Sequence, residues 1–153
     1  MKTIDIKASQ EELEIKNKFK RFVIETGHPC VMAQTMFRMD KVNLKIYDHF
    51  GSEEAALKIL TDLNGYLAEY EFGSDDFYTF MAVFNDETRY SEEQFEKQLW
   101  SQLQHLHNLD DHPWDPKVSS DPESRKFSFS LLGEAFYIVG MHPGSSRKAR
   151  RSC

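Results

Sequence analysis

The sequence predicts an α+β fold in which three main helices pack on a small mixed or antiparallel sheet. Apolar residues recur at helical spacing in three segments and at strand spacing in others, in the order helix–strand–helix–strand–helix–strand–strand. The chain has 153 residues, of which 40% are hydrophobic and 29% are charged, as is typical of one globular domain. Residues 1–153 are therefore expected to fold as a single domain.

The N-terminal part of the chain predicts a helix followed by a strand. Ser9 and Glu12 match a capping box ahead of a helix over about residues 10–25, where apolar side chains follow helical spacing. Residues 42–48 alternate apolar and polar side chains, which is the pattern of a half-buried strand.

A second helix and a second strand follow. Gly51 and Ser52 precede a segment in which apolar side chains form one helical face, and these side chains are Ala56, Ile59, Leu60, Leu63 and Leu67. Residues 77–84 are aromatic and apolar almost throughout, which predicts a central strand covered on both faces.

A third helix is the clearest element of the C-terminal half. Ser91 and Gln94 form a capping box, and one apolar stripe follows over about residues 92–109. The members of the stripe are Phe95, Leu99, Leu103 and Leu106. We expect this stripe to pack on the sheet that contains residues 80–84.

After this helix the sequence predicts a loop and a β-hairpin. Residues 110–121 are rich in proline and in side chains that bond locally to the backbone. Strands are expected at 127–131 and 135–139, on either side of a turn centred on Gly133.

Charge and hydropathy exclude several classes of function. The net charge is −6, which argues against nucleic-acid binding through a broad basic surface. The chain has no apolar stretch near the roughly 20 residues of a membrane-spanning helix and no signal-peptide pattern, so a cytoplasmic protein is expected. Phosphate-binding glycine loops, the HExxH zinc motif and CxxC pairs are absent. Cys30 and Cys153 lie far apart and are expected to be free thiols.

The basic end of the chain is its most unusual segment. Residues 143–153 contain four cations and no acid. A strand that leads into a Gly-Ser-Ser turn exposes backbone N–H groups and hydroxyls beside guanidinium groups, which suits a carboxylate or a phosphate. The side chains concerned are Ser145, Ser146, Arg147, Arg150 and Arg151. The alternative is a basic tail that faces solvent.

Two further positions each allow two interpretations. Cys30 follows His28 and Pro29 at a turn, where a thiolate or an imidazole is suited to a soft or borderline metal, including haem iron. The alternative is that Cys30 is a small buried apolar residue. Trp114 and Asp115 either line a pocket, or Trp114 packs over its own loop.

Several segments together carry a resemblance to a known family. They are Pro29-Cys30, Phe80-Met81-Ala82-Val83-Phe84, the helix text from Phe95 to His107, Trp114-Asp115-Pro116, Ser119-Ser120-Asp121-Pro122, Phe127-Ser128-Phe129-Ser130 and the run from Gly133 to Arg151. Taken together, these segments resemble the YqcI/YcgG family. The resemblance covers nearly the whole chain, and the stretch from Phe127 to Arg151 is its most specific part.

The resemblance implies an activity and a cofactor. Characterised members of that family are haem-dependent enzymes of the cycloserine and guanitoxin pathways. They hydroxylate a guanidino nitrogen of arginine or of an arginine-derived compound. The resemblance therefore implies haem b, O₂ activated at its iron, a small guanidino substrate and an electron donor that the sequence does not identify.

The same resemblance suggests roles for particular residues. Cys30 and His142 are alternative axial ligands of the haem iron. The side chains expected to contact the haem propionates are Ser145, Ser146, Arg147, Arg150 and Arg151. Those expected to contact the substrate guanidinium are Trp114, Asp115 and Glu134.

The end of the chain gives an alternative function. Family members usually continue beyond the Ser-Ser-Arg segment, whereas this chain ends at Cys153, so the C-terminal part of the family's domain is expected to be missing. The alternative is therefore a non-catalytic homologue, or a protein that binds haem or another small molecule.

Overall fold

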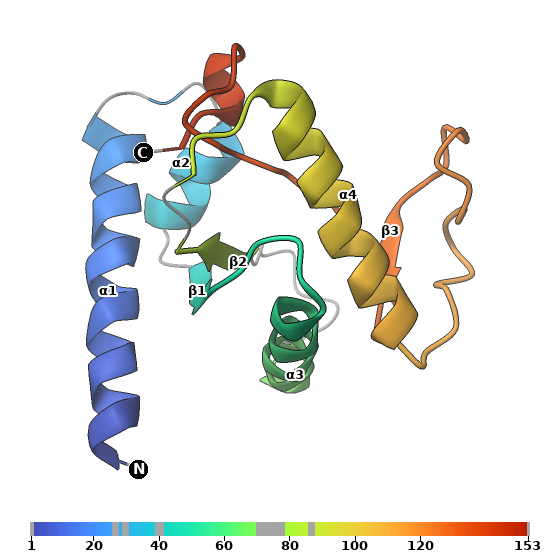
Figure 1. Ribbon diagram of the computed structural model, residues 1–153, viewed down its shortest axis with the longest axis horizontal. Helices are drawn as coiled ribbons and strands as arrows, with labels where there is room; N and C mark the ends of the chain where they lie inside the picture. The colour runs from blue at the N-terminus through green and yellow to red at the C-terminus, as the bar shows by residue number, and fades with distance from the viewer. Residues whose placement is uncertain are drawn as a thin grey trace.

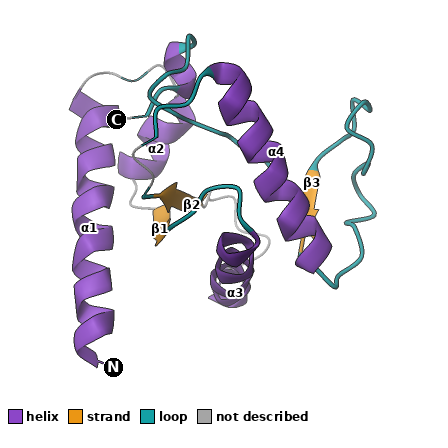
Figure 2. Cartoon of the chain, viewed as in Figure 1, coloured by secondary structure: helices purple, strands orange, loops and turns teal. Residues whose placement is uncertain are grey.

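The computed structural model describes residues 2–25, 28, 31–38, 42–69, 79–85 and 88–152, which form the α+β fold that the sequence predicts (Figures 1 and 2). In chain order the elements are α1 (Lys2–Glu25), α2 (Val31–Arg38), β1 (Val42–Tyr47), α3 (Glu53–Glu69), β2 (Thr79–Phe84), α4 (Glu92–Leu109), β3 (Phe129–Leu131) and β4 (Glu134–Phe136). A short 3-10 helix, η1 (Lys148–Arg150), lies near the C-terminus.

The strands form two separate pairs. β1 and β2 are parallel, with Val42 opposite Thr79, and α3 is the crossover that a parallel connection needs. The expectation that the second strand is covered on both faces is wrong. Among the described residues β1 is its only strand neighbour, and β2 is half-buried with Ala82 exposed. Residues 77–78 of the expected strand lie outside the described residues.

The N-terminal helices differ from the prediction in two respects. α1 begins at Lys2, so Ser9 lies inside the helix and is not its N-cap. The helix can extend this far because residues 2–9 contain no glycine or proline that would interrupt it. The sequence does not predict α2, because eight residues are too few for a helical period to stand out. α2 buries Met36 and Phe37 in a cluster with Val23 of α1.

The apolar stripe of α4 is buried as expected, with Leu103 and Leu106 as its most buried members. The surrounding cluster contains side chains of α3 and, at its margin, Phe80 and Phe84 of β2. The expectation that the stripe packs on this sheet is therefore met only at the margin of the cluster, because α4 packs mainly on α3. The capping box at Ser91 is confirmed.

A buried glutamine joins α4 to the turn before α3. Oε1 of Gln102 accepts the N–H of Gly51 at 2.7 Å, and its Nε2 donates to the carbonyl of Ser52 at 3.0 Å. Gly51 has a φ of 89°, where glycine is favoured. The hydroxyl of Ser52 accepts the N–H of Ala55, which confirms Ser52 as the cap of α3.

The C-terminal hairpin is confirmed, but its strands are shorter than expected. β3 and β4 are joined by Leu132 and Gly133, whose φ values of 54° and 80° match a two-residue type I′ turn. Residues 137–139 lie outside the second strand, and Tyr137 is 77% exposed.

Candidate functional site

The basic end of the chain is a folded loop. After the hairpin the chain returns along α4 and ends near the C-terminal end of α1 (Figure 1). We call residues 142–151 the arginine loop. The N–H of His142 donates to the carbonyl of Arg150 at 3.0 Å, and the N–H of Arg150 donates to that of Arg147 at 2.9 Å. Nε of Arg151 donates to the carbonyl of Ser145 at 2.7 Å. The segment is therefore closed by its own hydrogen bonds.

A carboxylate of α4 holds the arginine loop from one side. Oε1 of Glu92 accepts the N–H of Ser146 at 2.8 Å and also accepts its hydroxyl. These hydrogen bonds, together with the charge of His142, lower the pKa of Glu92 from its ordinary value of 4.5. Glu92 therefore fixes the Ser146 turn of the arginine loop against the start of α4.

His142 is buried and has an unpartnered ring nitrogen. Its side chain is 7% exposed and stacks on Phe95 of α4, with ring centroids 4.2 Å apart and planes inclined by 15°. Among the described residues Nδ1 has no hydrogen-bond partner. Gly144 lies close by, because a Cβ at that position would be 3.5 Å from Nδ1 and 2.8 Å from the carbonyl oxygen of Tyr90. The backbone therefore approaches His142 closely.

The three arginines of the loop have different surroundings. The guanidinium of Arg151 bonds to the carbonyls of Ser145 and Ser146 and so belongs to the loop's own framework. Arg147 is exposed and Arg150 is half-buried, and within the described part of the chain neither guanidinium has a partner. Arg147 and Arg150 are therefore the arginines available to a bound anion.

A second histidine, His28, also contacts the arginine loop. Nε2 of His28 donates to the carbonyl of Arg151 at 3.0 Å, and the His28 ring is 4% exposed beside Phe22 of α1. The His-Pro-Cys order predicts an imidazole or thiolate ligand at this turn, but nothing in the sequence predicts the contact of His28 with Arg151. Cys30 lies outside the described residues.

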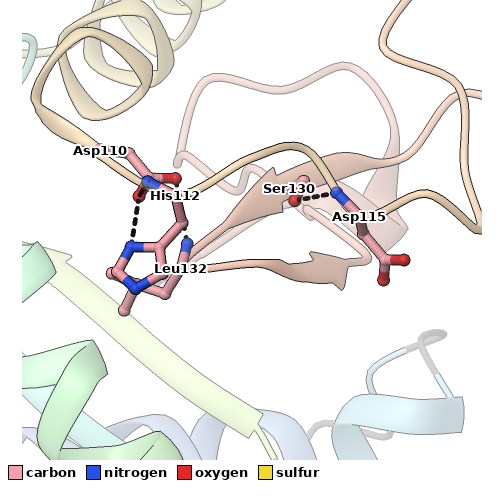
Figure 3. A network of polar contacts seen from close by, with 5 residues as sticks. All are labelled: Asp110, His112, Asp115, Ser130 and Leu132. Carbon is pink, nitrogen blue, oxygen red and sulfur yellow. Dashed lines mark hydrogen bonds and ion pairs between the residues drawn. The ribbon is translucent and has the colours of Figure 1, made fainter.

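Asp115 organises the hairpin (Figure 3). One carboxylate oxygen accepts the N–H of Lys117 at 2.9 Å and the other accepts that of Ala135 at 3.2 Å. Its own N–H donates to the hydroxyl of Ser130 at 3.0 Å. Asp110, at the end of α4, holds the hairpin turn in a similar way through the N–H of Leu132 at 3.0 Å.

Trp114 packs among aromatic rings, and Glu134 begins β4. The Trp114 ring meets Phe129 edge-on at 5.7 Å and His107 of α4 at 5.8 Å, and its Nε1 is buried without a partner in the described structure. Glu134 lies half-buried opposite Leu131 in the hairpin. The three residues expected at the substrate thus lie together on or beside the hairpin.

The two groups of predicted site residues lie at opposite ends of α4 (Figure 1). Phe95, near the start of the helix, contacts His142, whereas His107, near its end, contacts Trp114. Twelve residues separate Phe95 from His107, which is about 18 Å along a helix axis. A small substrate does not span that distance. Of the predicted cofactor residues, those at positions 142–151 lie together, Cys30 is outside the described residues, and the predicted substrate residues do not lie beside the loop.

Other features of the described residues add little to this site. A shallow hollow of about 300 Å³ lies at the start of α4, and it is lined by Thr88, Tyr90, Gln94, Lys97 and Gln98. No group of three His, Cys, Asp or Glu residues suited to a metal ion occurs among the described side chains. No helix in the described part of the chain is long and apolar enough to cross a bilayer.

Comparison with known proteins identifies the family. The model of the YqcI/YcgG family matches residues 19–153. The chain is 28% identical over 131 residues to the uncharacterized protein YcgG of Bacillus subtilis (strain 168), covering 81% of this chain and 50% of that protein. The chain thus spans half the length of this curated relative, and no solved structure matches it. The chain belongs to the YqcI/YcgG family.

Proposed function

We propose that this chain binds haem at the arginine loop and takes part in the O₂-dependent hydroxylation of a guanidino nitrogen. The observation that carries the proposal is the buried ring of His142, whose Nδ1 has no partner within the described structure. A buried polar group without a partner costs about 1–3 kcal/mol, so such a group in a folded protein calls for a function.

The residues of the arginine loop suit this cofactor. His142 would hold the haem iron, and Phe95 fixes the plane of the His142 ring by stacking. Arg147 and Arg150 would pair with the propionates, because neither guanidinium has a partner among the described residues. Haem, when bound, supplies an iron at which O₂ is activated. Cys30 remains the alternative ligand and lies outside the described residues.

Glu92 is the carboxylate that we assign to the substrate guanidinium. It is exposed at the start of α4, and its Oε1 is fixed by Ser146, four residues after His142 in the arginine loop. An anchored carboxylate binds a guanidinium with directed, charge-assisted hydrogen bonds. This assignment differs from the sequence-based expectation of Asp115, both of whose carboxylate oxygens already accept backbone N–H groups of the hairpin.

The proposal is tested by loading the protein with haem and supplying arginine, a reductant and O₂. We expect hydroxyarginine that carries oxygen from labelled O₂. Glu92→Gln should keep the haem and raise the arginine concentration needed for half-maximal rate by about tenfold or more, because a charged hydrogen-bonding partner is lost. Glu93→Gln, at the exposed neighbouring position, is the matched control and should behave as wild type.

Two results would contradict the proposal. A protein whose absorption spectrum after haem addition matches that of free haem does not bind the cofactor. A protein that binds haem but yields no hydroxylated product from any guanidino compound is a haem-binding homologue, which is the alternative function that the sequence leaves open.

A further inference from the structure

His28 connects the two ends of the chain. It follows α1, and Nε2 of its ring donates to the carbonyl of Arg151 at 3.0 Å, across a separation of 123 residues. The ring is 4% exposed and lies 5.5 Å from Phe22 at an angle of 58°. The carbonyl of His28 in turn accepts the side-chain amide of Gln34 on α2. His28 is therefore held in place by α1 and α2, and its ring contacts the arginine loop from there.

Arg151 transmits this contact into the loop. Its guanidinium donates hydrogen bonds to the carbonyls of Ser145 and Ser146, and its backbone N–H donates to the carbonyl of Lys148 at 3.2 Å. The preceding residue, Arg150, accepts the N–H of His142. A donor that holds the carbonyl of Arg151 therefore acts on the residue that fixes the serine turn. This residue directly follows Arg150, whose carbonyl accepts the N–H of His142.

We propose that His28 is a positioning residue. Its hydrogen bond to the carbonyl of Arg151, which we call the latch, holds the arginine loop against the end of α1 and thereby keeps His142 and Arg150 in place for the anionic cofactor. The assignment of the cofactor rests on the function proposed above, but the latch itself does not. A carbonyl oxygen only accepts hydrogen bonds, so the His28 tautomer must carry a proton on Nε2.

Three substitutions separate the donor from the rest of the side chain. His28→Phe keeps a ring beside Phe22 and removes the donor. His28→Gln keeps an amide N–H at about the reach of Nε2, whereas His28→Asn places its amide nearer to the position of Nδ1. His105→Ala, on α4 and away from the loop, is the control for loss of a histidine.

The latch is tested by limited digestion of the whole protein with trypsin, which cleaves after the basic residues of the loop. Trypsin can reach the exposed side chains of Arg147 and Lys148, but their carbonyls are held by the N–H groups of Arg150 and Arg151. Faster cleavage after these two residues therefore reports the opening of the loop. We expect His28→Phe and His28→Asn to be cleaved about three- to tenfold faster, the effect of one lost hydrogen bond, and His28→Gln to remain close to wild type. If His28→Phe does not fold, the Gln and Asn variants carry the comparison. Equal cleavage rates for all variants would overturn the latch.

Haem titration of the same variants tests the positioning role separately. We expect the dissociation constant to rise about three- to tenfold in His28→Asn and to recover in His28→Gln, in parallel with the cleavage rates. Faster cleavage with unchanged haem affinity would overturn the positioning role. If the wild-type protein binds no haem but His28→Asn is still cleaved faster than wild type, the proposed function is overturned and the latch stands.

Discussion

At the residue scale, Glu92 and Gly144 show how closely the arginine loop is fitted to α4. Glu92 accepts two hydrogen bonds from Ser146, and Gly144 allows the loop backbone to approach the carbonyl of Tyr90 and the ring of His142. Nothing in the sequence marks either residue, because acids are common in the first turn of any helix and Gly144 reads as part of an ordinary turn.

The contact between Glu92 and Ser146 should make the arginine loop sensitive to acid. The folded-state pKa of Glu92 lies below its ordinary value of 4.5 because Ser146 stabilises the carboxylate. The stabilisation is therefore complete above about pH 4.5 and is lost as the pH falls through the lowered value. We expect the amide NMR signal of Ser146 to shift as the pH falls and Glu92 is protonated, because the carboxylate that accepts this N–H is lost. In Glu92→Gln this pH dependence should be weaker, and an unchanged dependence would contradict the assignment.

A methyl group at position 144 should displace the loop. In Gly144→Ala the new Cβ would lie 2.8 Å from the carbonyl oxygen of Tyr90, so the backbone beside His142 must move. We expect a loss of about 1–3 kcal/mol in the free energy of unfolding, as for other overpacked sites, measured by denaturant titration. The control is Gly65→Ala, where no atom lies within 4 Å of the new Cβ in α3. That change should stabilise by roughly 0.5–1 kcal/mol, and a neutral Gly144→Ala would refute the close fit.

At the element scale, α4 supports both the core and the candidate site. Its capping box and apolar stripe are visible in the sequence, and the structure confirms both. The short helix α2 and the early start of α1 could not be predicted in this way. α2 is defined by tertiary burial of Met36 and Phe37, and the first residues of α1 lack any signal that distinguishes a helix start from its continuation.

Truncating the buried stripe of α4 should cost much of the protein's stability. Leu103 is 9% exposed in the cluster that α4 forms with α3, so Leu103→Ala should lower the free energy of unfolding by about 2–5 kcal/mol. Leu57→Ala, at a position of α3 that is 60% exposed, is the matched control and should change it by less than about 0.5 kcal/mol. Similar effects at both positions, measured by denaturant unfolding, would show that α4 does not pack as described.

At the scale of the whole molecule, folding separates residues that the sequence interpretation grouped together. The arginines and His142 are close in sequence and remain together, so this half of the site is predictable. Asp115 and Glu134 also lie near them in the chain, but the hairpin carries both to the far end of α4. His28 shows the reverse case, since it reaches Arg151 across 123 residues and no local pattern predicts that contact.

The charge of the arginine loop should act mainly through the cofactor. If Arg147 pairs with a propionate, Arg147→Ala should weaken haem binding about tenfold to a hundredfold, the value of one charge-assisted hydrogen-bonded pair. Arg89→Ala, which removes an exposed arginine outside the loop, should leave the affinity unchanged at the same ionic strength. Titration curves of Arg147→Ala that coincide with wild type would favour a solvent-facing basic segment instead.

The most direct test of the haem assignment is the absorption spectrum of the protein titrated with haem, compared among wild type, His142→Ala and Cys30→Ala. We predict a saturable Soret band in wild type and in Cys30→Ala, without the red-shifted carbonyl complex typical of thiolate ligation. His142→Ala should lose the saturable band while keeping its fold by circular dichroism. A wild-type spectrum that matches free haem, or a His142→Ala protein that binds haem as wild type does, would contradict the account.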